Sequence, residues 1–147
     1  MSNIYIDTSV LLPVIIQAHE NHGRSINVLR SALDKKSALF TSLHTQSELY
    51  RHLTRNVAPF TMSPANVEDV LLNDFAKLLT YVAGDSGVYR RSVQRLSGQG
   101  LRGAIIYDAL HLESALAIKA SILYTDNAKD FRRLLTPDDP IRIEGIR

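Results

Sequence analysis

The 147-residue chain contains no cysteine, which excludes disulfide bonds and thiolate metal sites. It also lacks an apolar run long enough to cross a bilayer, because the run from Val10 to Ile16 is short and is interrupted by Pro13. No basic segment precedes that run, as it would in a secretory signal peptide. We therefore expect a soluble, cytoplasmic protein with no membrane partner.

A strong excess of charge of either sign is also absent. Seventeen Lys and Arg oppose fifteen Asp and Glu, a net charge of +2, so composition alone does not indicate a nucleic-acid-binding protein. Four arginines nevertheless lie between Asp85 and Gly103, and acids gather near the C-terminal end. This distribution suits a phosphate-backbone ligand with a metal, although an ordinary solvated helix face has the same pattern. The candidate RNA-binding residues are Arg90, Arg91, Arg95 and Arg102.

Several common catalytic motifs are missing. The glycine-rich segment from Gly98 to Gly103 has no phosphate-binding loop pattern, and the chain has no Ser-His-Asp order with an elbow glycine. His44, Glu48 and His52 follow at i, i+4 and i+8, a spacing that suits Zn²⁺ but equally fits a solvated helix flank. These absences disfavour nucleotide-binding and nucleophilic hydrolase chemistry.

Short apolar segments alternate with amphipathic ones, which predicts alternating strands and helices in one domain over residues 1–147. Ile4, Tyr5 and Ile6 run without alternation, as in a strand that is buried on both faces. The segment from Leu78 to Ala83 fits a further strand, or the end of one long helix from Val70. The remaining strands are predicted at 38–42, 121–125 and 141–144, and the helices at 10–16, 24–36, 43–55, 64–77, from Asp85, from Ala104 and at 128–135.

Acidic residues follow the predicted strands. Asp7 comes directly after the first strand, Glu48 lies on the helix after the second, and Asp126 follows the strand that ends at Thr125. Since the carboxyl ends of parallel strands share one sheet edge, these acids can converge there. Asp7 could instead cap the next helix, although Thr8 and Ser9 are also good caps; we assign capping to Thr8 or Ser9.

Asp108 is predicted to lie at the border of an apolar helix face, about 40° from Leu112 at about 100° per residue. A carboxylate there is partly desolvated, and several carboxylates close together cannot all stay ionised without a cation. Mg²⁺ and Mn²⁺ prefer oxygen ligands and can present a water nucleophile to a phosphodiester. Glu113 is expected to lie well away on the other side of that face and to be less informative. His111 is expected to be a surface histidine, although it lies one turn beyond Asp108 and could reach a phosphate.

The motifs Ile4-Tyr5-Ile6-Asp7-Thr8-Ser9, Ser47-Glu48-Leu49, Tyr107-Asp108-Ala109 and Leu123 to Phe131 together resemble the PIN-domain family, in its usual order and over nearly the whole chain. The resemblance implies a single-domain α/β/α sandwich with a parallel sheet of about five strands. It also implies a Mg²⁺- or Mn²⁺-dependent ribonuclease most similar to VapC-type toxins, which usually form homodimers and are inhibited by a small antitoxin.

By position, Asp7, Glu48 and Asp108 match the three most regular acids of the family. Asp126 is the favoured fourth acid, and Asn127 and Asp130 compete for that place. Asp7, Asp108 and Asp126 are then the metal ligands, with Thr8 and Ser9 in supporting roles. Two alternatives stay open: a non-catalytic PIN-like module that holds RNA or a partner, and, less favoured, a phosphatase with Asp7 as nucleophile.

Overall fold

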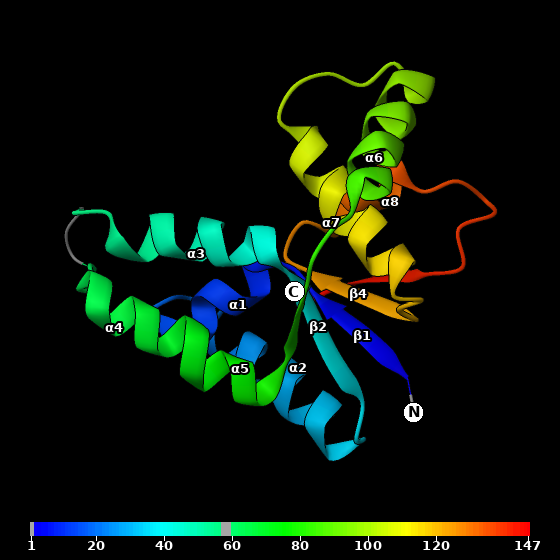
Figure 1. The fold of residues 1–147 in the computed structure, drawn as a ribbon. Helices are drawn as coiled ribbons and strands as arrows, with labels where there is room; N and C mark the ends of the chain where they lie inside the picture. Colours follow the sequence, from blue (N-terminus) through cyan, green and yellow to red (C-terminus); the bar gives the residue numbers. More distant parts are fainter. Residues whose placement is uncertain (1, 57–59) are drawn as a thin grey trace.

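The computed structural model describes residues 2–56 and 60–147, which form a central sheet between two layers of helices (Figure 1). The strands are β1 Asn3–Ile6, β2 Ala38–Ser42, β3 Thr80–Val82, β4 Ile122–Thr125 and β5 Arg142–Gly145. The α-helices are α1 Thr8–Ile15, α2 His22–Asp34, α3 Leu43–Thr54, α4 Pro64–Asp69, α5 Phe75–Leu78, α6 Ser86–Gln99, α7 Ile105–Ala117 and α8 Ala128–Leu134. A π-helical turn, η1 Val70–Asp74, joins α4 to α5.

The sheet has five parallel strands in the order β3-β2-β1-β4-β5, which confirms the predicted α/β/α fold. The first strand in sequence is the central one: Ile4 lies beside Leu39 of β2 on one side and Ile122 of β4 on the other. Because all strands run the same way, their carboxyl ends meet at one edge.

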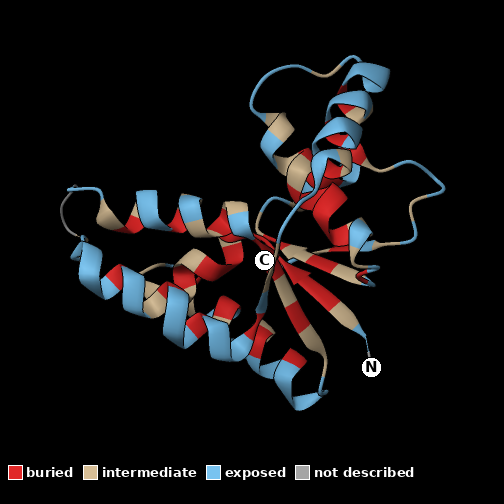
Figure 2. Cartoon of the chain, viewed as in Figure 1, coloured by how far each residue is buried: buried red, intermediate tan, exposed pale blue. Residues whose placement is uncertain are grey.

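Two apolar cores cover the two faces of the sheet, and β1 contributes to both. Ile4 and Ile6 pack into the core formed with α1 to α5, whereas Tyr5 packs into the core formed with α6, α7 and α8. Figure 2 shows the buried residues concentrated in the sheet and on the inner faces of the helices. The continuous apolar run of β1 is therefore explained by burial on both faces.

Helix α1 differs from its predicted bounds. It begins at Thr8 rather than at Val10, one residue after the end of β1, and Pro13 lies in its interior. The proline ring has no N–H for the usual bond to the carbonyl of residue i−4, which here is Ser9. The helix ends soon afterwards at Ile15.

The segment before β3 combines both predicted alternatives. Helical structure runs from Pro64 through η1 to Leu78, and a three-residue strand follows at Thr80–Val82. Within residues 2–56 and 60–147, no helix has the length and apolar character needed to cross a bilayer.

Candidate active site

Asp7 lies at the carboxyl end of the central strand and has two roles. Its backbone is extended and its side chain accepts a hydrogen bond from the Ser9 amide, so Asp7 itself caps α1. The prediction that Thr8 or Ser9 provides the cap is therefore wrong. The other carboxylate oxygen accepts a hydrogen bond from the buried Thr125 hydroxyl. These two bonds fix the carboxylate at the sheet edge, and both oxygens retain lone pairs for a further partner.

Glu48 projects from α3 toward the same edge and is held through one oxygen, Oε1. That atom accepts a hydrogen bond from Thr8 Oγ1 at 3.2 Å and lies 3.0 Å from His111 Nε2. His44 Nε2 lies 3.4 Å from the same oxygen. Burial alone would raise the pKa of Glu48, but the hydrogen bond and charge of His111, then the charge of His44, outweigh it and lower that pKa. Glu48 is therefore an ionised, oriented carboxylate.

Asp108 lies in the first turn of α7, half-buried, and faces Asp7 across the cleft. Burial, followed by the charge of Asp7, raises the pKa of Asp108 to about 6; the charge of His111 opposes this rise, and Asp130 and Glu48 add smaller contributions to it. Asp7 at the end of β1, Glu48 on α3 and Asp108 on α7 thus share one electrostatic environment.

The structure separates the candidates for the fourth acid. Both oxygens of Asp126 accept hydrogen bonds from Arg147, at 2.7 and 3.0 Å, and one also accepts a bond from Asn21. Neither Asp126 nor Asp130 lines the cleft, whereas Asn127 does. The Asn127 amide donates to Asp130, whose charge acts on Asp108. Asp126 is thus occupied by Arg147 and Asn21, whereas Asp130 contacts a residue of the cleft wall.

The cleft has a volume of about 260 Å³. Its walls are Asp7, Thr8, Ser9, Leu12, Glu48, His52, Tyr107, Asp108, His111 and Asn127. In the part of the chain that the structure describes, no three His, Asp or Glu side chains enclose one point closely enough to hold an ion alone. A hard cation here would need water and neutral oxygens besides the carboxylates, which is the coordination that Mg²⁺ favours.

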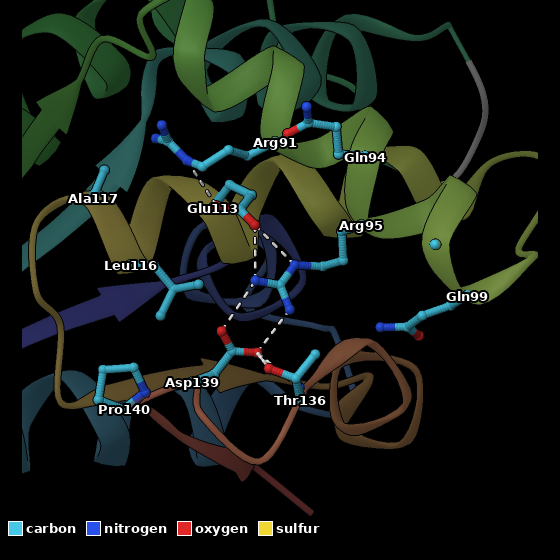
Figure 3. Close-up of a pocket in the computed structure, with 11 residues that line it drawn as sticks. Arg91, Gln94, Arg95, Gln99, Glu113, Leu116, Ala117, Thr136, Asp139 and Pro140 are labelled. Carbon is cyan, nitrogen blue, oxygen red and sulfur yellow. Dashed lines mark hydrogen bonds and ion pairs between the residues drawn. The ribbon is translucent and has the colours of Figure 1, made fainter.

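The predicted RNA-binding arginines lie away from this cleft. Arg95 donates to Glu113 and to both oxygens of Asp139, and its side chain is 11% exposed (Figure 3). Arg91 also pairs with Glu113 but is half exposed. These two arginines line a cavity of about 730 Å³ between α6, α7 and the segment from Thr136 to Pro140. Arg95 is thus engaged by acids, whereas Arg90 and Arg102 are exposed residues.

Two predictions about α7 are wrong. His111 is buried, with 3% exposure, and lies between Glu48 and Tyr5. The Tyr5 hydroxyl oxygen is 2.7 Å from Nδ1 of His111. Glu113 is also buried, between Arg91 and Arg95. The helical wheel contains the signal for Glu113, since it lies only about 40° from Ala109 of the apolar face. No such signal exists for His111, because contacts with α3 and β1 bury it.

The raised pKa of Asp108 predicts a pH-dependent stability. The folded chain holds a proton on Asp108 up to about pH 6, whereas the reference carboxyl releases it near 3.8. Between these values the folded state binds more protons, so this group favours folding at low pH and that contribution is lost as the pH rises through 6. In EDTA, Asp108→Asn should raise the free energy of unfolding by about 1–2 kcal/mol at pH 8 and by little at pH 4.

Urea unfolding at the two pH values measures this difference. Asp34→Asn, at the exposed end of α2, is the matched control and should change neither value. If Asp108→Asn and the parent chain had the same free energy of unfolding at pH 8, the Asp108 carboxylate would not be destabilised by burial and by Asp7, as we infer.

The family model described as PIN domain matches residues 4–134. Among curated protein sequences, none matches the chain.

Solved structures with the same fold include one of VapBC2 from Rickettsia felis bound to a DNA fragment from its promoter. It is 18% identical, with 97% of this chain and 98% of that chain covered and a TM-score of 0.67. VapC20 from Mycobacterium tuberculosis, described as a toxin that cleaves the sarcin-ricin loop, is 14% identical over 93% and 99% of the two chains, with a TM-score of 0.68. FitAcB from Neisseria gonorrhoeae is 16% identical over 96% of each chain, also with a TM-score of 0.68. Because the sequence identities are this low, the similarity to these structures establishes the fold of the chain and no more.

Proposed function

The chain belongs to the PIN-domain family, as its motifs predict, and on this premise we propose that it is a Mg²⁺- or Mn²⁺-dependent endoribonuclease, the toxin of a toxin–antitoxin pair. The observation that carries the proposal is the convergence of Asp7, Glu48 and Asp108 on one cleft at the carboxyl edge of the sheet. We propose that residues 1–147 form one nuclease domain.

The donor set of the cleft fits a hard divalent cation. Asp7 and Asp108 are oxygen donors whose mutual repulsion a cation relieves, and we propose both as ligands. The sequence favours Asp126 as the further ligand, but its pairing with Arg147 supports Asp130, acting with Asn127, in that place. When bound, the ion supplies positive charge to the phosphorane-like transition state and lowers the pKa of a coordinated water.

Glu48 has a different role in this proposal. Its Oε1 is occupied by Thr8, His44 and His111, so Oε2 is the oxygen left to accept a hydrogen bond from the attacking water. In the hydrolysis, the water oxygen bonds to phosphorus, one bridging P–O bond breaks, and the leaving oxygen takes up a proton. Thr8 and Ser9 support this arrangement, because Thr8 bonds Glu48 and Ser9 bonds the backbone amide of Asp126.

His111 should act on catalysis by positioning Glu48. His111→Leu removes the donor to Oε1, and we expect kcat to fall by about 10- to 100-fold, as for other residues that orient a catalytic group. His111→Gln can place an amide nitrogen near the position of Nε2, and so should recover most of the lost kcat. KM should change little in either variant, because His111 is buried behind Glu48.

Steady-state cleavage assays measure kcat and KM, and urea unfolding identifies any variant that has lost its fold. A glutamine variant as impaired as a folded leucine variant would contradict the positioning role.

The proposed activity is tested by incubating RNA with the chain and Mg²⁺ or Mn²⁺, with EDTA as the control. We expect cleavage that requires the cation. Retention of RNA without turnover, in the presence of either cation, would instead favour the non-catalytic binding module.

We further propose an antitoxin partner and a homodimer. VapBC and FitAB structures among the neighbours support the first. Exposed apolar side chains on α2 and in η1, such as Leu33 and Leu72, offer surface for a partner or a second copy. Size measurements of the chain alone and with the product of an adjacent small reading frame would test both.

A further inference from the structure

Tyr107 is an exposed aromatic residue on the wall of the catalytic cleft. It precedes Asp108 on α7 and lines the cleft together with Asp7 and Glu48, yet its side chain is 51% exposed. A half-exposed tyrosine ring offers a rigid apolar surface that a ligand can cover. Its place beside the acids makes a ligand of the reaction the natural cover.

The orientation of the ring is fixed from behind by His44. The two rings are stacked, with centroids 5.6 Å apart and an interplanar angle of 5°. His44 is itself held by Glu48 at 3.4 Å and packs edge-on against the buried His111 ring at 6.1 Å. One face of Tyr107 is therefore covered by His44, while about half of the side chain remains exposed in a preorganised position.

A flat, preoriented aromatic face next to a phosphodiester-cleaving centre matches a nucleobase. Unpaired bases stack on tyrosine in most modes of single-strand recognition, and such stacking tolerates different bases because each has a π-face. A base within a continuous helix is already stacked on its neighbours and cannot use the ring. The Tyr107 ring can therefore bind only a base that is not already stacked on its neighbours.

We propose that Tyr107, backed by His44, forms a nucleobase-stacking subsite that holds one unpaired base flanking the scissile phosphate. The inference rests on the proposed ribonuclease function and assigns the recognition of that base to the exposed side of the Tyr107 ring. Because the subsite contributes binding, Tyr107 should affect RNA affinity and KM more than kcat.

The test is a coupling measurement between the ring and individual bases. Binding of a short single-stranded RNA, and of the same RNA with one abasic nucleotide at each position in turn, is measured in EDTA for the parent chain, Tyr107→Ala, Tyr107→Phe and Tyr50→Ala. Tyr50, 44% exposed on α3 outside the cleft, is the matched control.

We expect one RNA position at which base removal weakens binding about 5- to 100-fold in the parent chain, in Tyr107→Phe and in Tyr50→Ala. In Tyr107→Ala, removal of that base should have no further effect. His44→Ala should weaken the coupling, and His44→Phe, which keeps a stacked ring, should retain it.

Three results would overturn the inference: no coupled position, equal effects of Tyr107→Ala and Tyr50→Ala, or a loss of RNA affinity in Tyr107→Ala that follows dissociation of a dimer. The last would assign Tyr107 to an interface between copies. Since binding is measured without turnover, cleavage of the same RNAs in Mg²⁺ tests the ribonuclease function separately.

Discussion

Asp108→Asn is expected to lower RNA cleavage by about 100- to 10,000-fold while leaving the fold intact. A bound cation supplies several kcal/mol of transition-state stabilisation, and each 1.36 kcal/mol corresponds to about a tenfold change in rate. Asparagine keeps the shape of the side chain but removes the charge that opposes the cation. Asp108 is half-buried beside Asp7, so its neutralisation should also relieve repulsion in the metal-free protein. Single-turnover cleavage at saturating Mg²⁺ measures the loss.

Two matched substitutions locate the remaining acid. Asp130→Asn should reduce cleavage strongly, because the Asp130 charge reaches Asp108. Asp126→Asn should retain most activity, because its carboxylate is bound by Arg147 and Asn21. If Asp126→Asn lost more cleavage activity than Asp130→Asn, Asp126 would be the ligand. Full cleavage activity of Asp108→Asn would exclude the cleft as the active site.

Among the substitutions proposed for this chain, Arg95→Met is expected to lower the free energy of unfolding most, by about 3 kcal/mol. Removing one partner of a buried ion pair leaves the other charge uncompensated in a poorly solvated site. Arg95 connects α6 to Glu113 of α7 and to Asp139 (Figure 3), and it also donates to the Leu134 carbonyl. Methionine retains the apolar part of the stem, so the expected cost comes from the lost charge and hydrogen bonds.

Arg91→Met is the matched control, because Arg91 pairs with the same Glu113 but is half exposed. Its loss should change the free energy of unfolding by less than about 1 kcal/mol. Urea unfolding compares the two variants, and RNA affinity of the folded proteins should be nearly unchanged in Arg95→Met. Similar stabilities of both variants, or a large loss of RNA affinity in Arg95→Met alone, would favour the phosphate-binding role that the sequence predicts for Arg95.

The fold could be predicted from the sequence because its main signals are local. Ile4, Tyr5 and Ile6 indicate a strand buried on both faces, and the acid after it marks the sheet edge. Helix bounds are less accurate where cap geometry decides them: α1 begins two residues before the predicted Val10 because Asp7 accepts the Ser9 amide. The π-turn in η1 has no sequence signal of its own.

The convergence of Asp7, Glu48 and Asp108 on one cleft could be predicted, but the contacts that orient these acids could not. Periodicity places Asp108 at the border of an apolar face, yet says nothing of His111, whose burial depends on α3 and β1 packing against α7. Likewise, the run of arginines on α6 indicates a basic surface only until Glu113 and Asp139 are placed beside Arg95. These two acids are far from Arg95 in the sequence, so the pattern of arginines on α6 could not reveal that they pair with it.

The central claim is that the acids of this cleft direct water, with a divalent cation, onto an RNA phosphodiester. Cleavage in ¹⁸O-labelled water, followed by mass spectrometry of the new RNA ends, tests it most directly. We predict one ¹⁸O in each newly formed terminal phosphate in Mg²⁺ or Mn²⁺, and no cleavage in EDTA. Products ending in an unlabelled 2′,3′-cyclic phosphate, formed equally in EDTA, would contradict the claim.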